Sequence, residues 1–200
     1  MKTEELLIWV NEDDEEIGFG KKMDTHVKGI LHRAFSLFIY NTFDNTLLIH
    51  KRAHVKYHSG GLWTNSCCSH PRCGEGLIQA VKRRMREELG IDNIQLYENG
   101  TIISLQELGS FKYYQQYESC SEHEIDHVFS MVINDKHPSI TFDHNEIERV
   151  KWITIEDLEE WYHAKPSDFT AWFYQAYLLF KQHIEMICYT DRAVDKHPKI

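Results

Sequence analysis

Blocks of apolar residues along the chain predict strands first, then one central helix, further strands, and two helices at the end. Strands are expected at Glu5–Val10, His32–Tyr40, Thr46–Arg52, Ile94–Ser110, Phe111–Tyr117, Glu122–Asn134 and Val150–Ile153. Gly100 and Gly109 should interrupt the fourth of these strands, and the fifth and sixth should form a hairpin. Because the order does not repeat a strand–helix–strand unit, it predicts an α/β (α+β) sandwich with a mixed sheet and flanking helices.

The first two helices carry clear start and stop signals. Glu75–Leu89 has apolar residues at helical spacing and is followed by Gly90, which should end the helix. Thr154 is placed to cap a helix over Ile155–His163, with Asp157 at the capping-box position.

The last helix is expected to begin at Ser167 or Asp168 and to run to about Ile187. Its aromatic residues should lie in the core or in a lid over a site. We expect a single domain over residues 1–200, with an N-terminal strand extension, a C-terminal helical lid and a loose tail at 189–200.

The central helix places charged residues on the side that should face the sheet. At 3.6 residues per turn one stripe contains Leu77, Ile78, Val81, Met85 and Leu89. Glu88 falls inside this stripe, and Arg84 lies one turn before it. A carboxylate on an apolar face is costly unless it is paired or bound to a cation. Either the two residues form an i,i+4 ion pair, or a metal or phosphate site lies over this face.

Composition narrows the classes of function. The net charge of −9 argues against a nucleic-acid partner that needs a broad basic surface, and the chain has no apolar run long enough for a membrane span. The five cysteines are an odd number, and two of them, Cys67 and Cys68, are adjacent, which suits a disulfide framework poorly. We therefore expect a reducing, cytoplasmic location.

Histidine and acidic residues suggest a metal site. Glu122 and Glu124 are two residues apart in a predicted strand, so their carboxylates should share one face. Together with His26, His32 and His70 they could fill an octahedral nitrogen and oxygen site suited to Mg²⁺, Mn²⁺ or a similar ion. The alternative is that the two carboxylates lie on a solvated strand edge.

A second metal hypothesis is a closed zinc site in a non-enzymatic binding module. Cys67, Cys68, His70 and Cys73 have suitable side chains for such a site. Their spacing does not give paired Cys-x₂-Cys arms, so this hypothesis ranks below the histidine and glutamate site.

Basic residues near these segments could bind a small dianion, since lysine and arginine both donate to phosphate. The candidates are Lys21, Lys22, Lys51, Arg52, Lys56, Arg83 and Arg84. The alternative is ordinary surface charge, which we accept for Lys51 and Arg83.

Several of these segments resemble the type 1 isopentenyl-diphosphate isomerases, members of the Nudix superfamily. The similar segments are LHRAFSLFIYN (Leu31–Asn41), WTNSCCSHP (Trp63–Pro71), RRMREELG (Arg83–Gly90), SEHEIDHVF (Ser121–Phe129) and, more weakly, NEIERVKWI (Asn145–Ile153). The resemblance extends from about Glu5 to Trp172 and implies a Nudix-like mixed-sheet fold.

The central helix departs from the general Nudix pattern at two positions. Ser69 stands where that pattern has glycine, and Arg84 stands where it has glutamate. Losing a carboxylate at position 84 weakens the magnesium cluster that Nudix hydrolases use, and an arginine there would instead bind diphosphate. The resemblance therefore favours an isomerase, with a Nudix hydrolase that cleaves a diphosphate as the alternative.

The resemblance also implies roles for individual residues. It makes Cys68 the catalytic thiol, Glu124 the second catalytic group and Tyr113 its assistant, with Tyr114 as the alternative tyrosine. It implies a divalent metal (Mn²⁺, Mg²⁺ or Zn²⁺) held by His26, His32, His70, Glu122 and Glu124. Glu88 would hold a Mg²⁺ ion that enters with the diphosphate, and the substrate would contact Lys22, Arg52, Lys56, Arg84 and Trp172.

The implied reaction interconverts isopentenyl and dimethylallyl diphosphate through a tertiary cation, and it needs an acid and a base on opposite sides of a flat five-carbon unit. In the direction of dimethylallyl diphosphate, Glu124 and Tyr113 would deliver the proton and the Cys68 thiolate would remove one. Nearby cations should favour that thiolate, and Trp172 or Trp63 could stabilise the carbocation. The partner is then a small prenyl diphosphate, with the protein a monomer or weak homodimer.

Overall fold

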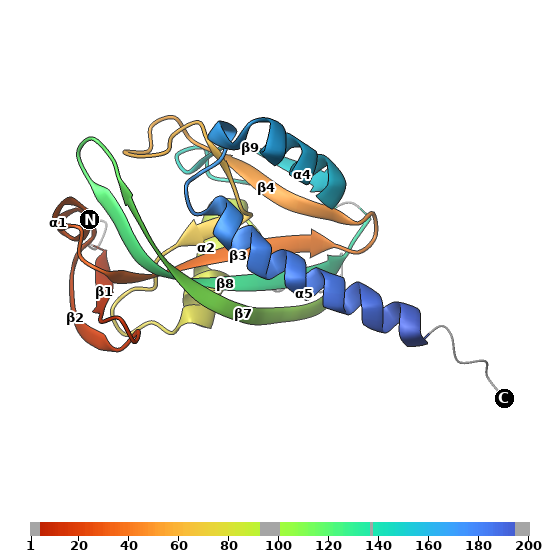
Figure 1. Cartoon of the computed structure of the whole chain (residues 1–200), viewed down its shortest axis with the longest axis horizontal. Helices are drawn as coiled ribbons and strands as arrows, with labels where there is room; N and C mark the ends of the chain where they lie inside the picture. Colours follow the sequence, from red (N-terminus) through yellow and green to blue (C-terminus); the bar gives the residue numbers. More distant parts are fainter. Residues whose placement is uncertain (1–4, 93–100, 137, 195–200) are drawn as a thin grey trace.

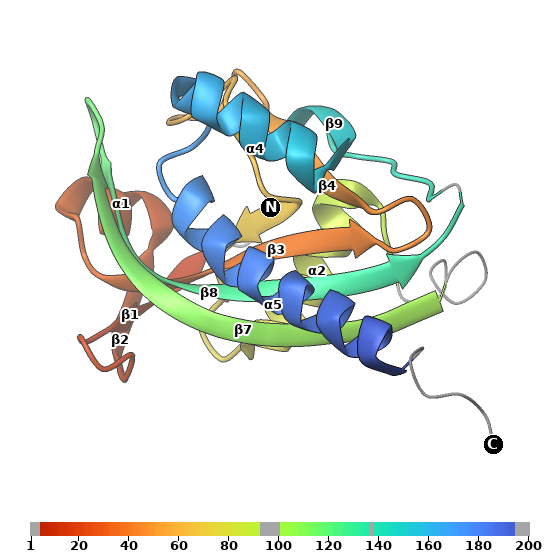
Figure 2. The same ribbon diagram turned by 45° about the vertical axis from the view of Figure 1, so that its right-hand side comes forward.

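The computed structural model describes residues 5–92, 101–136 and 138–194, and within them one nine-stranded mixed sheet has helices on both faces (Figures 1 and 2). The strands are β1 (Leu6–Val10), β2 (Glu16–Lys21), β3 (His32–Asn41), β4 (Thr46–Arg52), β5 (Trp63–Thr64), β6 (Cys67–Ser69), β7 (Thr101–Gln116), β8 (Ser121–Asn134) and β9 (Ile147–Thr154). The helices are α1 (Lys22–Lys28), α2 (Leu77–Leu89), α4 (Ile155–Ala164), the 3₁₀ turn η1 (Pro166–Asp168) and α5 (Phe173–Val194). The predicted mixed α/β architecture is confirmed.

Strand β3 is the centre of the sheet. It pairs in parallel with β8 over its whole length and antiparallel with β1, β4 and β6 along its other edge. Strand β7 continues the sheet beyond β8, and β9 pairs with β4. Because both faces of β3 are covered, its sequence is a nearly unbroken apolar run.

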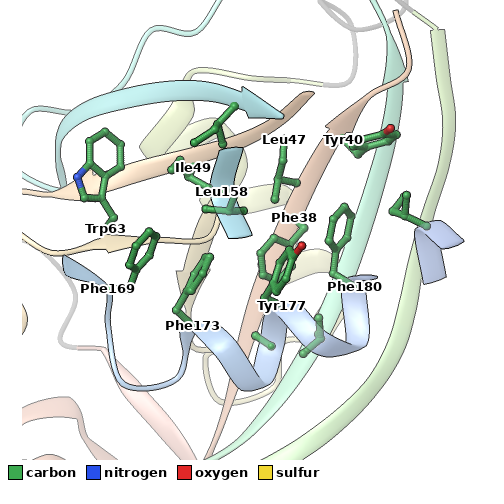
Figure 3. Close-up of a cluster of buried hydrophobic side chains, with 14 of the residues drawn as sticks. Phe38, Tyr40, Leu47, Ile49, Trp63, Leu158, Phe169, Phe173, Tyr177 and Phe180 are labelled. Atoms are coloured by element: carbon green, nitrogen blue, oxygen red, sulfur yellow. The ribbon is translucent and has the colours of Figure 1, made fainter. Parts of the chain in front are cut away.

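Alternating side chains of β3 supply two separate cores. Phe35, Leu37 and Ile39 pack toward α2, with Val81 and Met85. Phe38 and Tyr40 belong to the opposite core, where α4 and α5 cover the sheet (Figure 3). The strand periodicity of two thus sends successive residues into different layers.

The helix α5 starts later than the sequence predicts. Pro166–Asp168 forms only a single 3₁₀ turn, and Phe169 returns to extended backbone. Thr170 then donates its amide to the carbonyl of Trp63, which ties this segment to β5 before the helix can begin.

The body of α5 belongs to the core, not to a lid. Phe173, Tyr177 and Phe180 are fully buried against the sheet (Figure 3). The helix continues past Ile187 to Val194, so the first part of the predicted tail at 189–200 is helical and residues 195–200 lie outside the described part of the chain. The prediction of a lid over the site therefore applies only to Trp172, which lies just before α5.

Strand β7 is longer than expected. It runs without interruption through Gly109, whose φ of 131° accompanies a register shift against β8 between Glu107 and Gly109. Such a bulge bends a strand without ending it, so the predicted break at Gly109 is wrong. Gly100, the other predicted break, lies outside the described residues.

The sequence did not predict β2 or α1, and α1 matters because it carries His26. β2 is a largely exposed edge strand whose Gly18 and Gly20 lie against the ring of Trp9. A Cβ atom at Gly20 would lie 2.2 Å from that ring, so packing against β1 requires glycine there. Because glycines weaken the strand pattern in the sequence, β2 was not predicted.

Helix α2 lies where it was predicted and ends at Gly90, which adopts the left-handed conformation at φ 65°. Val81, Met85 and Leu89 are buried as expected, but Ile78 is 53% exposed and Ala80 is buried in its place. Across the described residues, none of the helices combines the length and apolar character that a membrane crossing requires.

Candidate active site

The sheet register brings three candidate residues into one row. His32 on β3 pairs with Glu124 on β8, and Glu124 pairs with Tyr113 on β7. The Tyr113 hydroxyl donates to Glu124 Oε2 at 2.6 Å. Tyr114 points elsewhere: it is 56% exposed, and its hydroxyl contacts Gln116. Of the two tyrosines, Tyr113 is therefore the one that contacts Glu124.

The five candidate metal ligands converge. One ligand atom from each residue lies within 4.8 Å of all the others, and the set is His26, His32, His70, Glu122 and Glu124. The Nε2 atom of His70 is 2.8 Å from Glu124 Oε1, and that of His32 is 3.4 Å from the same oxygen. The alternative of a solvated strand edge is wrong, because Glu122 and Glu124 are buried.

Two of the histidines are oriented as metal ligands. The Nδ1 atoms of His26 and His32 lie 2.7 and 2.8 Å from the backbone carbonyls of Lys22 and Ile30, so each Nδ1 carries the proton. The Nε2 atoms are buried, face the carboxylates and make no hydrogen bond. A carbonyl that fixes the tautomer and leaves Nε2 free is the usual arrangement behind a metal-bound histidine. The donor set fits a divalent cation.

The two carboxylates also need a cation. Burial beside Glu124 raises the pKa of Glu122 to about 7. Burial alone would raise the pKa of Glu124 too, but the neighbouring side chains of Glu122, His32 and His70 hold it well below its usual range. Two buried carboxylates at this distance cannot both ionise without compensation, and a divalent ion would supply it.

A pocket beside this cluster contains most of the predicted site residues. Its lining includes Lys22, Arg52, Lys56, Cys68, His70, Arg84, Glu88, Tyr113, Glu122, Glu124 and Trp172. His26 and His32 are fully buried and are not part of the lining. The pocket therefore joins the metal cluster, the candidate thiol and the basic residues in one space.

Cys68 enters the pocket from β6, where it pairs with Ser36 of β3. The guanidinium of Arg52 lies 3.7 Å from its Sγ atom. Burial nevertheless raises the pKa of the thiol to about 12, and Arg52 only partly offsets this effect. Arg52 and Lys56 do favour the thiolate, as expected, but desolvation outweighs their attraction in the resting site.

This thiol pKa predicts slow alkylation of Cys68 near neutral pH. Because the thiolate is the reactive form, the rate of modification by iodoacetamide should keep rising with pH beyond pH 9. Cys73 is exposed and should react first, which provides an internal comparison within the same chain. Peptide mass spectrometry would measure both rates. A Cys68 rate that levels off below pH 8 would contradict the prediction.

Cys67 has a structural environment. It is fully buried in the core beneath α2, and its thiol contacts Glu88 Oε2 at 3.4 Å. Within the described residues the converging ligand group contains no cysteine, and Cys73 is exposed. The zinc hypothesis is therefore not supported by this arrangement.

Three cations gather at one end of the pocket. Burial and the charges of Lys56 and Arg84 lower the pKa of Lys22, although Glu5 opposes them. Glu146 lies between two of these cations, with its carboxylate 2.5 Å from Lys56 Nζ and 3.4 Å from Arg84 Nη2. Burial would raise the pKa of Glu146, but the two cations hold it at about 2. Such a cluster suits a dianion such as diphosphate.

The ion-pair hypothesis for the central helix is confirmed, and the hypothesis of a metal or phosphate site over this face stays a prediction. Arg84 donates to Glu88 Oε1 through Nε at 2.9 Å, which is the i,i+4 pair. Both side chains also line the pocket. Arg84 thus neutralises the buried carboxylate of Glu88 at a place where a bound ligand could rearrange the pair.

The two tryptophan candidates differ. Trp172 is buried, lines the pocket and carries the guanidinium of Arg52 over its ring at 5.3 Å. Trp63 packs instead against Trp161 in the core that α4 and α5 cover (Figure 3). Trp63 is therefore a core residue and cannot face a substrate in this pocket.

The pocket residues that sequence reasoning missed include two carboxylates and a histidine. Asp126 lies two residues beyond Glu124 on the same face of β8, so strand alternation could have identified it. Glu146 lies in the weakly similar segment, just before β9, and His58 lies in the loop between β4 and β5. No spacing signal pointed to either of these two residues.

Comparison with known proteins agrees with this geometry. The NUDIX domain family matches residues 30–173. A crystal structure from Deinococcus radiodurans has a TM-score of 0.65 and 24% identity, covering 88% of this chain and 98% of that one, which supports the fold alone.

The closer sequence relatives carry one name. Isopentenyl-diphosphate Delta-isomerase 2 of Photorhabdus laumondii is 42% identical over 85% of this chain and 89% of the relative. Isopentenyl-diphosphate Delta-isomerase of Serratia proteamaculans is 39% identical over 85% and 88%.

The fold and the matched domain define a Nudix protein. Within that class, the chain belongs to the isopentenyl-diphosphate Delta-isomerase family.

Proposed function

We propose that the protein interconverts isopentenyl diphosphate and dimethylallyl diphosphate by adding a proton to one carbon and removing a proton from another. Glu124 with Tyr113 forms one proton-handling unit, and Cys68 forms the other. The observation that carries this proposal is that both units line one pocket, from strands β8 and β6, beside a cluster of cations.

In the direction of dimethylallyl diphosphate, the Tyr113–Glu124 unit gives a proton to the terminal alkene carbon, which becomes a methyl group. The tertiary cation that results then loses a proton from the carbon next to the diphosphate-bearing one. Cys68 accepts that proton as a thiolate, and the reverse reaction exchanges the roles. Since burial favours the neutral thiol, Cys68 must ionise before the forward reaction, and Arg52 at 3.7 Å stabilises its charge.

His26, His32, His70, Glu122 and Glu124 would hold one divalent ion, with Mn²⁺, Mg²⁺ or Zn²⁺ as candidates. When bound, such an ion would neutralise the paired carboxylates and hold Glu124 in place. Glu88 would hold a Mg²⁺ ion that accompanies the diphosphate. The orphaned Nε2 atoms of His26 and His32 support the first of these sites.

Lys22, Lys56 and Arg84 would bind the diphosphate, which anchors the substrate away from the reacting carbons. Trp172 would cover the five-carbon unit and help to exclude water, with Tyr113 at a ring-centroid distance of 6.1 Å. The arginine at position 84 favours keeping the diphosphate intact over the alternative, a Nudix hydrolase that cleaves it.

Incubation of the protein with isopentenyl diphosphate and Mg²⁺ in heavy water should place deuterium in a methyl group of dimethylallyl diphosphate. Proton and phosphorus NMR of one sample would follow the alkene and the diphosphate together. Methyl deuteration with no inorganic phosphate is the expected result. Release of inorganic phosphate without methyl deuteration would instead support the hydrolase.

The remaining assignments are also proposals. A reducing, cytoplasmic location is supported by the free state of Cys67, Cys68, Cys73 and Cys120. The state of monomer or weak homodimer and the absence of a nucleic-acid partner stay predictions from the sequence.

A further inference from the structure

The loop between β4 and β5 brings a sixth polar side chain to the metal cluster. His58, in this loop, is buried, and its Nε2 atom lies 2.6 Å from Glu122 Oε1. That oxygen is buried and has no hydrogen-bond partner, and His26 Nε2 approaches it at 3.4 Å. The oxygen that faces the ligand cluster is thus also the one that His58 contacts.

His58 is itself held in place from several sides. Its ring lies 4.8 Å from that of Tyr117 at an angle of 31°, and 6.0 Å from that of Trp172. Its Nδ1 atom is 3.2 Å from the hydroxyl of Ser59, which is 3.0 Å from the Tyr117 hydroxyl. The Ser59 hydroxyl donates to Tyr117 and can accept from Nδ1, so these contacts hold the ring with Nε2 against Glu122.

The same residue connects the metal cluster to the thiol. Arg52 Nη2 donates to the backbone carbonyl of His58 at 3.4 Å, while Arg52 Nη1 lies 3.7 Å from Cys68 Sγ. The position of the loop therefore affects both a carboxylate of the cluster and the cation beside the thiol.

His58 lies outside the set of converging ligand atoms. Among the described residues that set consists of three histidines and two glutamates within 4.8 Å of one another, and His58 is not part of it. For comparison with this 4.8 Å span, two ligand atoms on opposite sides of an octahedral ion are about 4.2 Å apart when each bond is about 2.1 Å long. His58 contacts an oxygen of a candidate ligand but does not itself belong to the set. This is the geometry of a residue that orients a ligand.

We propose that His58 is a positioning residue that orients Glu122 for metal binding. This inference rests on the proposed function, because it takes the His/Glu cluster to be the metal site. His58 acts through Glu122 and does not touch the reacting carbons. Removing it should weaken metal binding while leaving the number of histidine nitrogens on the metal unchanged.

The test uses the full chain, stripped of metal and titrated with Mn²⁺ while electron paramagnetic resonance records free Mn²⁺. His58→Ala should bind the ion about 10- to 100-fold more weakly than the wild type, the range for loss of a residue that supports a metal ligand. His58→Gln keeps a polar side chain that can contact Glu122 and should recover much of the affinity. His54→Ala is the matched control, since that histidine lies in the same loop with its side chain 71% exposed.

Pulsed resonance on the Mn²⁺-loaded proteins separates orienting from direct binding. Three histidine nitrogens are expected in the wild type and in His58→Ala. Loss of one nitrogen in His58→Ala would make His58 a ligand and overturn the proposal, as would wild-type Mn²⁺ affinity in that variant. Circular dichroism identifies a misfolded variant, in which case His58→Gln decides the outcome: native Mn²⁺ affinity and three nitrogens agree with the proposal, and a lost nitrogen overturns it.

The wild-type protein separates this inference from the function on which it rests. Absence of a Mn²⁺ site in the wild type would overturn both the metal assignment and the role of His58. A wild type that binds Mn²⁺ and isomerises isopentenyl diphosphate, together with an unaffected His58→Ala, would overturn the role of His58 alone.

Discussion

Cys68→Ser should lower the turnover of isopentenyl diphosphate by about 10³-fold or more, the scale expected when one proton-transfer group is lost. The substitution changes the side chain by one atom, so the pocket should keep its shape. A serine hydroxyl has a much higher pKa than a thiol, and Arg52 cannot compensate for that difference. The measurement is the steady-state rate together with circular dichroism.

The matched control is Cys67→Ser, which makes the same chemical change one residue earlier. Cys67 is fully buried and contacts Glu88, and a hydroxyl can still donate to that carboxylate. We expect this variant to retain turnover within about 10-fold of the wild type, because it keeps both proton-handling groups. An inactive Cys67→Ser beside an active Cys68→Ser would show that the wrong sulfur was assigned.

Removal of divalent metal should abolish isomerisation and also lower the melting temperature. A ligand present at about 100 times its dissociation constant stabilises the native state by about 2.7 kcal/mol. For a chain of this size that corresponds to about 5–10 °C. The physical reason is that Glu122 and Glu124 are buried together, and the ion offsets their repulsion. Differential scanning fluorimetry before and after chelation measures the change.

Glu122→Gln provides the control for metal removal. A neutral amide relieves the repulsion between the carboxylates and also removes a strong ligand, so the melting temperature of this variant should respond little to a chelator. Re-addition of Mn²⁺ should restore the wild type and not the variant. An unchanged wild-type melting temperature on chelation would show that the cluster does not bind the ion in solution.

Most of the central elements could be predicted from the sequence. β3, β4 and α2 follow directly from apolar periodicity, and Gly90 ends α2 as expected. The edge strand β2 could not be predicted, because its glycines are required by the ring of Trp9 on the neighbouring strand. The start of α5 depends on Thr170, whose backbone bond to Trp63 is not visible in the local sequence.

The site residues likewise include some that the sequence predicted and some that it did not. The alternation in β8 predicts that Glu122 and Glu124 share a face, and the family resemblance names the histidines that join them. His58 and Glu146 were missed because each contact spans a long stretch of chain, with Lys56 and Glu146 lying 90 residues apart. The sequence predicts the cations near Cys68 but says nothing about the burial of its thiol, which has the larger effect on the pKa.

The sequence by itself determined the types of side chain available for the reaction, the strand that carries Glu122 and Glu124, the helix that carries Glu88, and the arginine that replaces a carboxylate at position 84. Only the tertiary structure decided which of the described histidines converge, which tyrosine reaches Glu124, and which tryptophan faces the pocket. Periodicity is a local property of the chain, whereas convergence depends on the register between strands that are distant in sequence, such as β3 and β8.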